Sequence, residues 1–411
     1  MYPPRTLDAA LRRWLAGACL TMVAGSVGAG PASAQPGSPA AGCRDRLTAA
    51  AVAAGVRPAT ITEALRDFTP DSSVLVARQR QPEFVTPIWD YLAFLVDEER
   101  IADGRERLTI WADALEQAEQ RFGVDRHTIV AVWGIESDYG RVLGQRPLVR
   151  SLATEACHGT RRAFAAEQFV ATLRILDTGE LTADQLRGSW AGAFGQTQFM
   201  PTTFLSTAVD LDGDGRRDIV GSVPDALGST ARFLQRAGWK TGARWGYEVK
   251  VPNPYRGPSG RTARRSVADW TKAGVRRLDG RVIVASGPAA LLFPAGKRGP
   301  AFLVFANYDA IYSYNAAQSY ALAIGLLANR LRGEVGLVRE WPTADRGLSR
   351  AERREVQERL AAKGWYTGPA DGVLGQQTRD AIRRFQAAVG LPVDGRAGGG
   401  VLDSLRARTS R

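Results

Sequence analysis

Apolar side chains recur three and four positions apart along most of the chain, the spacing that buries one face of an α-helix. This pattern predicts helices over residues 43–56, 60–68, 99–123, 125–137, 161–177, 224–237 and 313–333. Gly123 is expected to end the third of them, and Asp125 is expected to cap the start of the fourth. The chain is therefore predicted to be mainly α-helical.

Two regions depart from this pattern. Short β-type runs between Gly and Pro occupy residues 247–254, 282–286, 291–296 and 301–308. Near the end of the chain, three more helical segments alternate with two turns that each contain an Asp-Gly pair. We therefore predict a mainly α (α+β) fold with three parts: a helical domain over 43–338 that carries a small strand-rich insertion, a linker over 339–347, and a three-helix module over 348–409.

The first 34 residues have the pattern of a cleaved secretory signal. Arg5, Arg12 and Arg13 precede an apolar run rich in Gly and Ala, which ends in small residues before Gln35. An uncleaved membrane anchor is the alternative that this composition disfavours, and the choice between general and twin-arginine export stays open. We expect cleavage after Ala34, a linker over 35–42, and a soluble periplasmic protein.

Charge and cysteine content narrow the class of partner and the compartment. The chain has 54 basic and 42 acidic residues, a formal net charge of +12, which suits an anionic partner. The sequence has neither zinc-ligand spacings nor a basic heptad region, so no nucleic-acid partner is expected. Removal of the signal leaves Cys43 and Cys157. In an oxidising compartment they most simply form one disulfide, and two buried free thiols are the alternative.

One carboxylate follows an apolar run that is typical of a core helix. Glu136 ends the stretch IVAVWGIE, and burying a carboxylate is costly unless it is paired or protonated. Residues 189–204 are rich in Gly, amides and aromatics, the side chains suited to a groove for a sugar polymer. Because an apolar setting raises the pKa of a carboxylic acid, Glu136 is a candidate general acid. A solvent-facing Glu is the alternative.

Six motifs in one order carry a resemblance to a known family. They are WGIESDYGR, RSLAT, RRAFAAEQF, GSWAGAFGQTQFMPTTF, DLDGDGRRDI and YNAAQSYALAI, and they resemble the B-type lytic murein transglycosylases, which have a lysozyme-like catalytic core. The resemblance covers roughly residues 43–335. It implies that Glu136 is the single catalytic acid/base. It also implies that the site is lined by Ser189, Gln198, Tyr314 and Asn315, with Phe199, Tyr320 and the substrate-facing pair Arg161 and Arg162 nearby.

The chemistry implied by this resemblance uses one carboxylate. Ordinary glycosidases use two, about 5–9 Å apart, and Asp138 lies only two positions after Glu136, on another face of a helix. In the family, the acid protonates the oxygen leaving N-acetylmuramic acid. It then acts as a base toward that sugar's own C6 hydroxyl, which closes a 1,6-anhydro ring. A hydrolytic muramidase and a non-catalytic scaffold that only holds peptidoglycan are the alternatives.

Residues 210–218 read DLDGDGRRD, the start of a calcium-binding loop with carboxylates at alternate positions and Gly at the sixth. The usual Glu at the twelfth position is absent, and the family's longer EF-hand-like loop, here 210–225, implies a carboxylate further on. The expected ligands are Asp210, Asp212, Asp214, the backbone carbonyl of Arg216, and Asp225. We predict a structural Ca²⁺ and no organic cofactor; an acidic turn that binds nothing is the alternative.

Residues 349–407 resemble the small three-helix peptidoglycan-binding domain of cell-wall enzymes, through a pattern written G…DG.LG..T..AI..FQ…GL.VDG. The segment RAGGGVLDSL departs from that family, which usually has a Thr before the last helix. A packing domain without ligand is the alternative. The expected partners are peptidoglycan glycan strands, with other cell-wall enzymes as further candidates, and the protein is expected to be a monomer.

Overall fold

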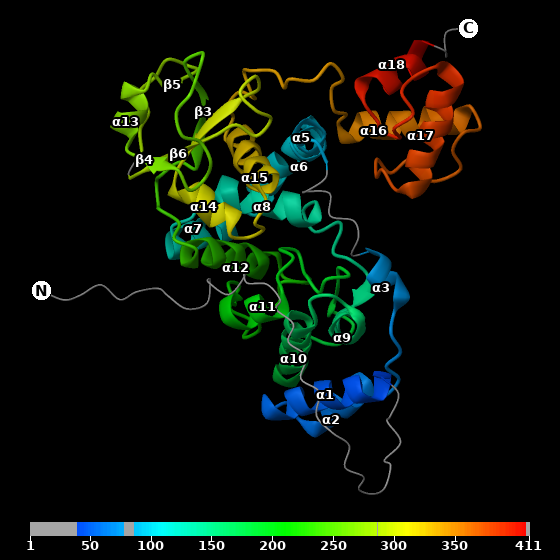
Figure 1. Cartoon of the computed structure of the whole chain (residues 1–411). Helices are drawn as coiled ribbons and strands as arrows, with labels where there is room; N and C mark the ends of the chain where they lie inside the picture. Colours follow the sequence, from blue (N-terminus) through cyan, green and yellow to red (C-terminus); the bar gives the residue numbers. More distant parts are fainter. Residues whose placement is uncertain (1–38, 78–85, 286, 408–411) are drawn as a thin grey trace, which may run out of the picture.

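The computed structural model describes residues 39–77, 86–285 and 287–407, so the predicted signal peptide lies outside the described residues. Helices dominate the chain and one small antiparallel sheet lies at one end, which confirms the predicted fold class (Figure 1). Residues 39–42, expected in the linker, instead begin α1 (Pro39–Ala53), because a Pro in the first helical turn lacks only an amide hydrogen that the helix does not use. Across the described ranges, each helix is too short or too polar to cross a membrane.

The described residues from 39 to 340 form the larger part of the molecule. Its remaining helices before the sheet are α2 (Pro58–Leu65), α3 (Ser72–Ala77), α5 (Ile88–Leu95), α6 (Glu98–Ile110), α7 (Ala112–Phe122), α8 (Arg126–Ser137), α9 (Leu148–His158), α10 (Arg162–Thr178), α11 (Pro201–Thr207) and α12 (Val223–Arg236). Two short strands, β1 (Arg146–Pro147) and β2 (Arg187–Gly188), pair antiparallel. Helices α14 (Ala306–Tyr312) and α15 (Gln318–Leu331) follow the sheet.

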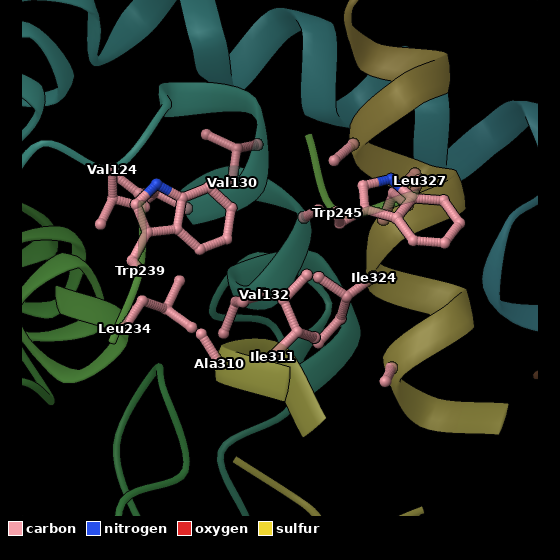
Figure 2. Packing of buried hydrophobic residues seen from close by; sticks show 14 of the residues in the cluster. Val124, Val130, Val132, Leu234, Trp239, Trp245, Ala310, Ile311, Ile324 and Leu327 are labelled. Atoms are coloured by element: carbon pink, nitrogen blue, oxygen red, sulfur yellow. The ribbon is translucent and has the colours of Figure 1, made fainter. Parts of the chain in front are cut away.

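Helix α8 lies at the centre of the largest core. Most of its apolar side chains, among them Val130 and Val132, are fully buried against α7, α12, α14 and α15 (Figure 2). Trp239 and Trp245 fill the space at the edges of this cluster. A second core joins α1, α2, α9 and α10 to the aromatic residues of the 189–204 stretch. The two cores meet where the candidate site residues gather.

The strand-rich insertion is a five-stranded antiparallel sheet in the order β4-β6-β7-β3-β5. Its strands are β3 (Gly246–Lys250), β4 (Arg264–Arg265), β5 (Arg276–Arg277), β6 (Ala289–Leu292) and β7 (Ala301–Val304), and α13 (Val267–Lys272) accompanies them. Phe302 and Val304 face the central core, whereas Leu303 faces Trp270 of α13. Burial on both faces explains why these strands read as unbroken apolar runs.

Several sequence predictions have different bounds in the structure. Of the runs 247–254 and 291–296, only Gly246–Lys250 and Ala289–Leu292 are strands, and the helix expected over 313–333 is Gln318–Leu331. The segment 99–123 is broken at Trp111, because a bend there lets Ile101 of α6 and Leu115 of α7 each reach the core. Residues 282–285 form no strand, since Val282 and Val284 are exposed and have no partner strand. The run 301–308 is a strand only to Val304, because α14 begins at Ala306.

The C-terminal module has its own apolar core, built by α16 (Arg350–Ala362), α17 (Gln376–Val389) and α18 (Gly399–Ala407). Val356, Ile382 and Leu402 from the three helices are fully buried in it. A capping box at Ser349 and Glu352 begins α16. The module lies beside α5 and α6 of the larger part (Figure 1).

Candidate active site

Helix α8 places Glu136 in the next-to-last position of a core helix. The Asp125 side chain caps its start by accepting a hydrogen bond from the Thr128 amide at 3.2 Å. Residues along the helix are buried on every side, yet the Glu136 side chain near its end is only half-buried. The sequence prediction of a carboxylate at the end of a core helix therefore describes its position in the structure.

The backbone immediately after Glu136 turns sharply. Asp138 and Tyr139 both have left-handed backbone conformations, with φ of 51° and 60°. The Tyr139 ring folds back against the helix and meets Trp133 edge-on, with ring centroids 5.6 Å apart. A Cβ at Gly134 would lie 2.6 Å from this ring, so the glycine allows the close approach. The residues after Glu136 therefore pack back against the last turn of α8 and hold it in place.

Two tyrosines from the α14–α15 region lie beside the Glu136 carboxyl. The Tyr320 hydroxyl donates a hydrogen bond to Glu136 Oε1, and the Tyr320 and Tyr314 rings stack with centroids 6.4 Å apart. Burial raises the pKa of both phenols, and the nearby charge of Glu136 raises it further. Both hydroxyls therefore stay protonated, and Tyr320 acts as a donor to the carboxyl. This places Tyr320, expected only nearby, in direct contact with the acid.

The amide-rich stretch 189–204 is bound to the same end of α8. Ser137 Oγ donates to the Gln196 carbonyl at 2.6 Å, and Trp133 Nε1 donates to Gln196 Oε1 at 3.0 Å. The Tyr314 hydroxyl donates to the Thr197 carbonyl at 2.6 Å. This stretch, α8 and the tyrosine pair therefore form one hydrogen-bonded unit around Glu136.

Sequence reasoning did not identify Ser137, Gln196 or Thr197 as parts of this unit. Ser137 follows Glu136 in the ES motif, and Gln196 lies two positions before the predicted Gln198. A buried side chain that bonds backbone atoms of another segment has no local pattern. The two amides in GQTQF are the local signal, and the predicted lining includes only the second, Gln198.

The other predicted lining residues lie in the same stretch or beside the tyrosines. Gln198 has φ of 50°, and its side-chain amide donates to the Gly195 carbonyl at 2.8 Å. Ser189 Oγ accepts a hydrogen bond from the Ala193 amide at 3.1 Å. Phe199 is buried, with its ring 5.9 Å from that of Tyr314. Asn315 follows Tyr314 and is half-buried.

Arg161 and Arg162 lie at the start of α10 and are exposed. The Arg161 guanidinium packs over the Phe164 ring at 4.3 Å, and Arg162 Nε donates to the Gly159 carbonyl at 3.2 Å. These contacts hold the pair at the helix start but do not link it to the tyrosine pair. Its role toward substrate carboxylates stays a prediction.

Asp138, the carboxylate nearest to Glu136 in sequence, is engaged by cations. Its Oδ1 atom lies 2.7 Å from Arg350 Nη1 and 3.2 Å from Arg100 Nη2, and its Oδ2 atom lies 3.4 Å from Arg141 Nη1. A carboxylate shared among three guanidinium groups is poorly suited to act as a nucleophile or a base. The arrangement therefore favours chemistry with one carboxyl, that of Glu136.

The acidic loop brings three of the predicted calcium ligands together. Oxygen atoms of Asp210, Asp212 and Asp214 lie within 4.8 Å of one another. Hard oxygen ligands on a tight Gly-containing loop are what Ca²⁺ prefers, so these residues fit the ion. The Arg216 amide donates to Asp214 Oδ1 at 2.8 Å, which holds the turn.

Asp225 takes a different place from the three clustered carboxylates. It is fully buried at the start of α12, where its oxygens accept hydrogen bonds from the amides of Leu211 and Asp218, both at 2.7 Å. These bonds tie both ends of the loop to α12. In this structure Asp225 therefore holds the backbone of the loop through these hydrogen bonds.

The cysteines that remain after the predicted signal are bonded to each other. Cys43 in α1 and Cys157 in α9 form a disulfide, with Cα atoms 5.7 Å apart. The bond lies in the second core, and it closes a segment with a sequence separation of 114 residues. It therefore fastens the first helix to the helices beneath the site.

Comparison with known proteins matches each of the two parts of the chain to a protein family. Residues 40–329 match the family described as transglycosylase SLT domain, and residues 349–405 match a peptidoglycan binding domain family. The first match covers well over half of the chain. The chain therefore belongs to the transglycosylase SLT domain family.

Two solved structures of similar proteins each align with more than two thirds of this chain. SltB3 from Pseudomonas aeruginosa, in complex with NAG-anhNAM-pentapeptide, is 43% identical with a TM-score of 0.72, over 90% of this chain and 100% of that chain. Slt35 from Escherichia coli, in complex with calcium, is 25% identical with a TM-score of 0.63, over 72% of this chain and 93% of that chain.

A curated relative is the membrane-bound lytic murein transglycosylase B of Escherichia coli strain K12. It is 30% identical over 229 residues, which are 52% of this chain and 59% of that protein. The match thus spans a little more than half of the relative's length. These similarities agree with the family resemblance that the sequence motifs carry.

Proposed function

We propose that this protein is a lytic murein transglycosylase. It cleaves the β-1,4 bond between N-acetylmuramic acid and N-acetylglucosamine of peptidoglycan without water, and it leaves 1,6-anhydro-N-acetylmuramic acid ends. The observation that carries the proposal is the single carboxyl of Glu136, held by Tyr320, beside an Asp138 that three arginines engage. The family and the SltB3 complex with an anhydro-muropeptide support the same reaction.

The chemistry assigned to Glu136 follows from its place. In the first step the protonated carboxyl gives its proton to the glycosidic oxygen as the bond to C1 breaks. In the second step the resulting carboxylate takes the proton of the C6 hydroxyl, whose oxygen bonds to C1 and closes the ring. The proton count balances, and one residue serves as acid and then as base. The Tyr320 hydrogen bond orients the carboxyl and stabilises its charged form between the steps.

The remaining predicted residues are proposed to hold the glycan strand. The half-buried amide of Gln198, the hydroxyl of Ser189 and the side chain of Asn315 offer hydrogen bonds to sugar hydroxyl and N-acetyl groups. Arg161 and Arg162 offer charge to the lactyl or peptide carboxylates. The C-terminal module is proposed to bind the same polymer, which keeps the enzyme close to its insoluble substrate.

The acidic loop is proposed to bind a structural Ca²⁺ through Asp210, Asp212, Asp214 and the Arg216 carbonyl. The ion would neutralise carboxylates that otherwise repel one another. The bonds of Asp225 to the loop amides support this conformation, and we propose that Asp225 braces the loop through them. Its role as a further calcium ligand stays a prediction. The site of action is proposed to be the periplasm, because the N-terminal sequence has the pattern of an export signal and the substrate is the cell wall.

The test is release of soluble fragments from purified sacculi by the full-length mature protein and by Glu136→Gln. We expect the variant to lose release by about a thousandfold, the middle of the range for general acid–base catalysis, while it still sediments with sacculi. Release at the wild-type rate would refute the role of Glu136. A wild-type protein that sediments but releases nothing would indicate the scaffold instead.

A further inference from the structure

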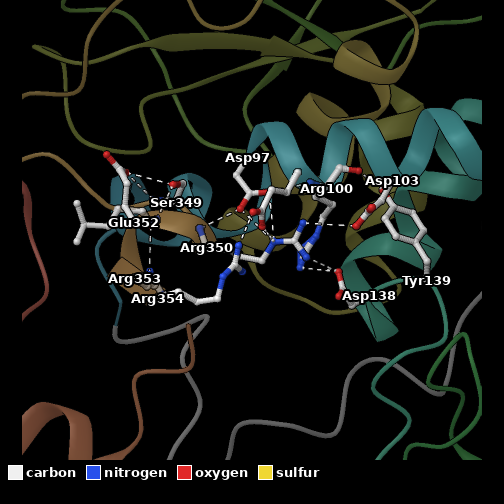
Figure 3. A network of polar contacts seen from close by, with 12 residues as sticks. Asp97, Arg100, Asp103, Asp138, Tyr139, Ser349, Arg350, Glu352, Arg353 and Arg354 are labelled. Atoms are coloured by element: carbon white, nitrogen blue, oxygen red, sulfur yellow. Dashed lines mark hydrogen bonds and ion pairs between the residues drawn. The ribbon is translucent and has the colours of Figure 1, made fainter. Parts of the chain in front are cut away.

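The C-terminal module contacts the part of the molecule that carries Glu136 through a largely buried polar network (Figure 3). Arg353 of α16 packs over the Phe94 ring at 4.3 Å and donates to the Asp90 carbonyl at 3.0 Å. Arg396 forms a bidentate pair with Asp90, with both distances 2.7 Å. The two parts are therefore joined by specific contacts as well as by the linker.

Arg350, the first residue of α16, bonds to two carboxylates of the larger part. Its amide and its Nε atom donate to Asp97 Oδ2 at 2.9 and 3.0 Å. Its Nη1 atom donates to Asp138 Oδ1 at 2.7 Å. The side chains of Arg350 and Asp97 are only 11% and 2% exposed, so solvent screens this pair little.

One partner of Arg350, Asp138, lies two positions after the proposed catalytic acid, Glu136. Asp138 is the residue that caps the C-terminal end of α8, and its left-handed backbone sets the direction of the chain after Glu136. Figure 3 shows Arg350 between Asp97, at the start of α6, and Asp138. The guanidinium therefore links the start of one helix to the end of the helix that carries Glu136.

The charged guanidinium of Arg350 stabilises two carboxylates of this network, those of Asp97 and Asp138. Burial lowers the pKa of Arg350, but its hydrogen bond to Asp97 and the charges of Asp97 and Asp138 outweigh burial, and the pKa lies above its usual range. The guanidinium is therefore always charged. Loss of one partner from a buried pair is unfavourable for the charge that stays behind. Without Arg350, Asp97 would lose its ion pair across the interface. Asp138 would lose its shortest contact with a guanidinium and keep the longer ones to Arg100 and Arg141.

We infer that Arg350 is a positioning residue through which the C-terminal module fixes the end of α8 and hence the Glu136 carboxyl. The module then contributes to the reaction itself as well as to attachment. This inference rests on the proposed function. A module that only attached the enzyme to the wall would affect KM on the insoluble polymer. A positioning residue affects kcat, even on a short soluble glycan.

The test compares Arg350→Gln with the wild-type full chain on soluble NAG–NAM oligomers carrying stem peptides. We expect kcat to fall about tenfold with KM unchanged within twofold, because small misplacements of a catalytic group reduce the rate strongly. The matched control is Arg354→Gln. Arg354 comes from the same helix and pairs across the same interface, but with Glu99, which is 42% exposed. This control is expected to keep kcat within twofold.

Asp138→Asn and the double variant complete a double-mutant cycle. Asp138→Asn preserves volume, so it carries the test even if Arg350→Gln does not fold by circular dichroism. We expect each single variant to lower kcat and the double variant to be less impaired than the product of the two effects. Unchanged kcat in Arg350→Gln or Asp138→Asn, an effect on KM alone, or multiplicative losses would overturn the inference. A wild-type protein without activity would instead refute the proposed function.

Discussion

Tyr320 holds the Glu136 carboxyl by a hydrogen bond from a buried phenol, across a sequence separation of 184 residues. Removing that hydroxyl while keeping the ring isolates the contribution of the bond. Tyr320→Phe is expected to lower kcat by about 10- to 100-fold, since a hydrogen bond to a charged group contributes ~1.5–3 kcal/mol and 1.36 kcal/mol corresponds to tenfold. The measurement is the initial rate of product release from soluble glycan.

The matched control for this variant is Tyr308→Phe. Tyr308 lies buried in the same core, and its hydroxyl donates a long 3.4 Å hydrogen bond to the Gln318 carbonyl. Its rate should stay within twofold of the wild type. Equal rates for Tyr320→Phe and Tyr308→Phe would show that the contact with Glu136 does not assist the reaction.

The sequence could locate Glu136 but not the contacts that hold it. A carboxylate directly after a run of apolar residues is visible locally, because the cost of burying it makes it unusual. Tyr320 lies in an apolar helix, whose pattern alone marks an ordinary core residue, and the family resemblance implies only that it lies near the site, not that it bonds to Glu136. Gln196 is equally hidden, since its bonds to Trp133 and Ser137 cross between segments.

At the level of the helix, α8 depends on its N-terminal cap. Asp125→Ala is expected to lower the free energy of unfolding by about 1 kcal/mol at pH 7, the usual cost of losing an N-cap side chain. Asp113→Ala, an exposed position in the first turn of α7, is the control and should change it little. Urea denaturation measures both. Equal stability of the two variants would contradict the role of the cap.

The contribution of Asp125 should also depend on pH. Burial raises its pKa, but hydrogen bonds from His127 and Thr128 and the charge of Arg332 outweigh burial and lower it to about 2, from an ordinary value of 3.8. A carboxyl with a lowered pKa in the folded state stabilises above its unfolded pKa and loses that contribution as pH falls. The difference between wild type and Asp125→Ala should therefore shrink between about pH 4 and 2.

The acidic loop gives a third prediction at this scale. Ca²⁺ at about 100 times its Kd should stabilise the folded protein by ~2.7 kcal/mol, because it binds only the folded loop. This stabilisation raises the melting temperature, and Asp212→Asn should lose most of that increase. Asp184→Asn, whose side chain is 95% exposed outside the loop, should keep it. An identical melting temperature with Ca²⁺ and with a chelator would contradict a calcium site.

Helix existence was easier to predict from the sequence than helix bounds. The Asp125 cap and the apolar run after it give α8 directly, because both signals are local. The break at Trp111 between α6 and α7 has no such signal, since apolar spacing continues through it. The tertiary core decides where that segment bends.

At the scale of the whole molecule, the two parts and their order were predictable, whereas their docking was not. Composition and motif changes near residue 340 separate the parts, and the apolar core of the C-terminal module is self-contained. Arg350 and Asp138 are 212 positions apart, and an arginine at a helix start predicts no distant partner. The network that joins the parts therefore appears only in the folded chain.

The most direct test of the central claim is the mass of the muropeptides that the full-length mature protein releases from purified sacculi. If Glu136 activates the sugar's own C6 hydroxyl, the products carry 1,6-anhydro ends. Each is then one water lighter than a reducing sugar, and Glu136→Gln yields none of them. Products with reducing ends would instead show that water is the nucleophile and would contradict the ring-closing mechanism.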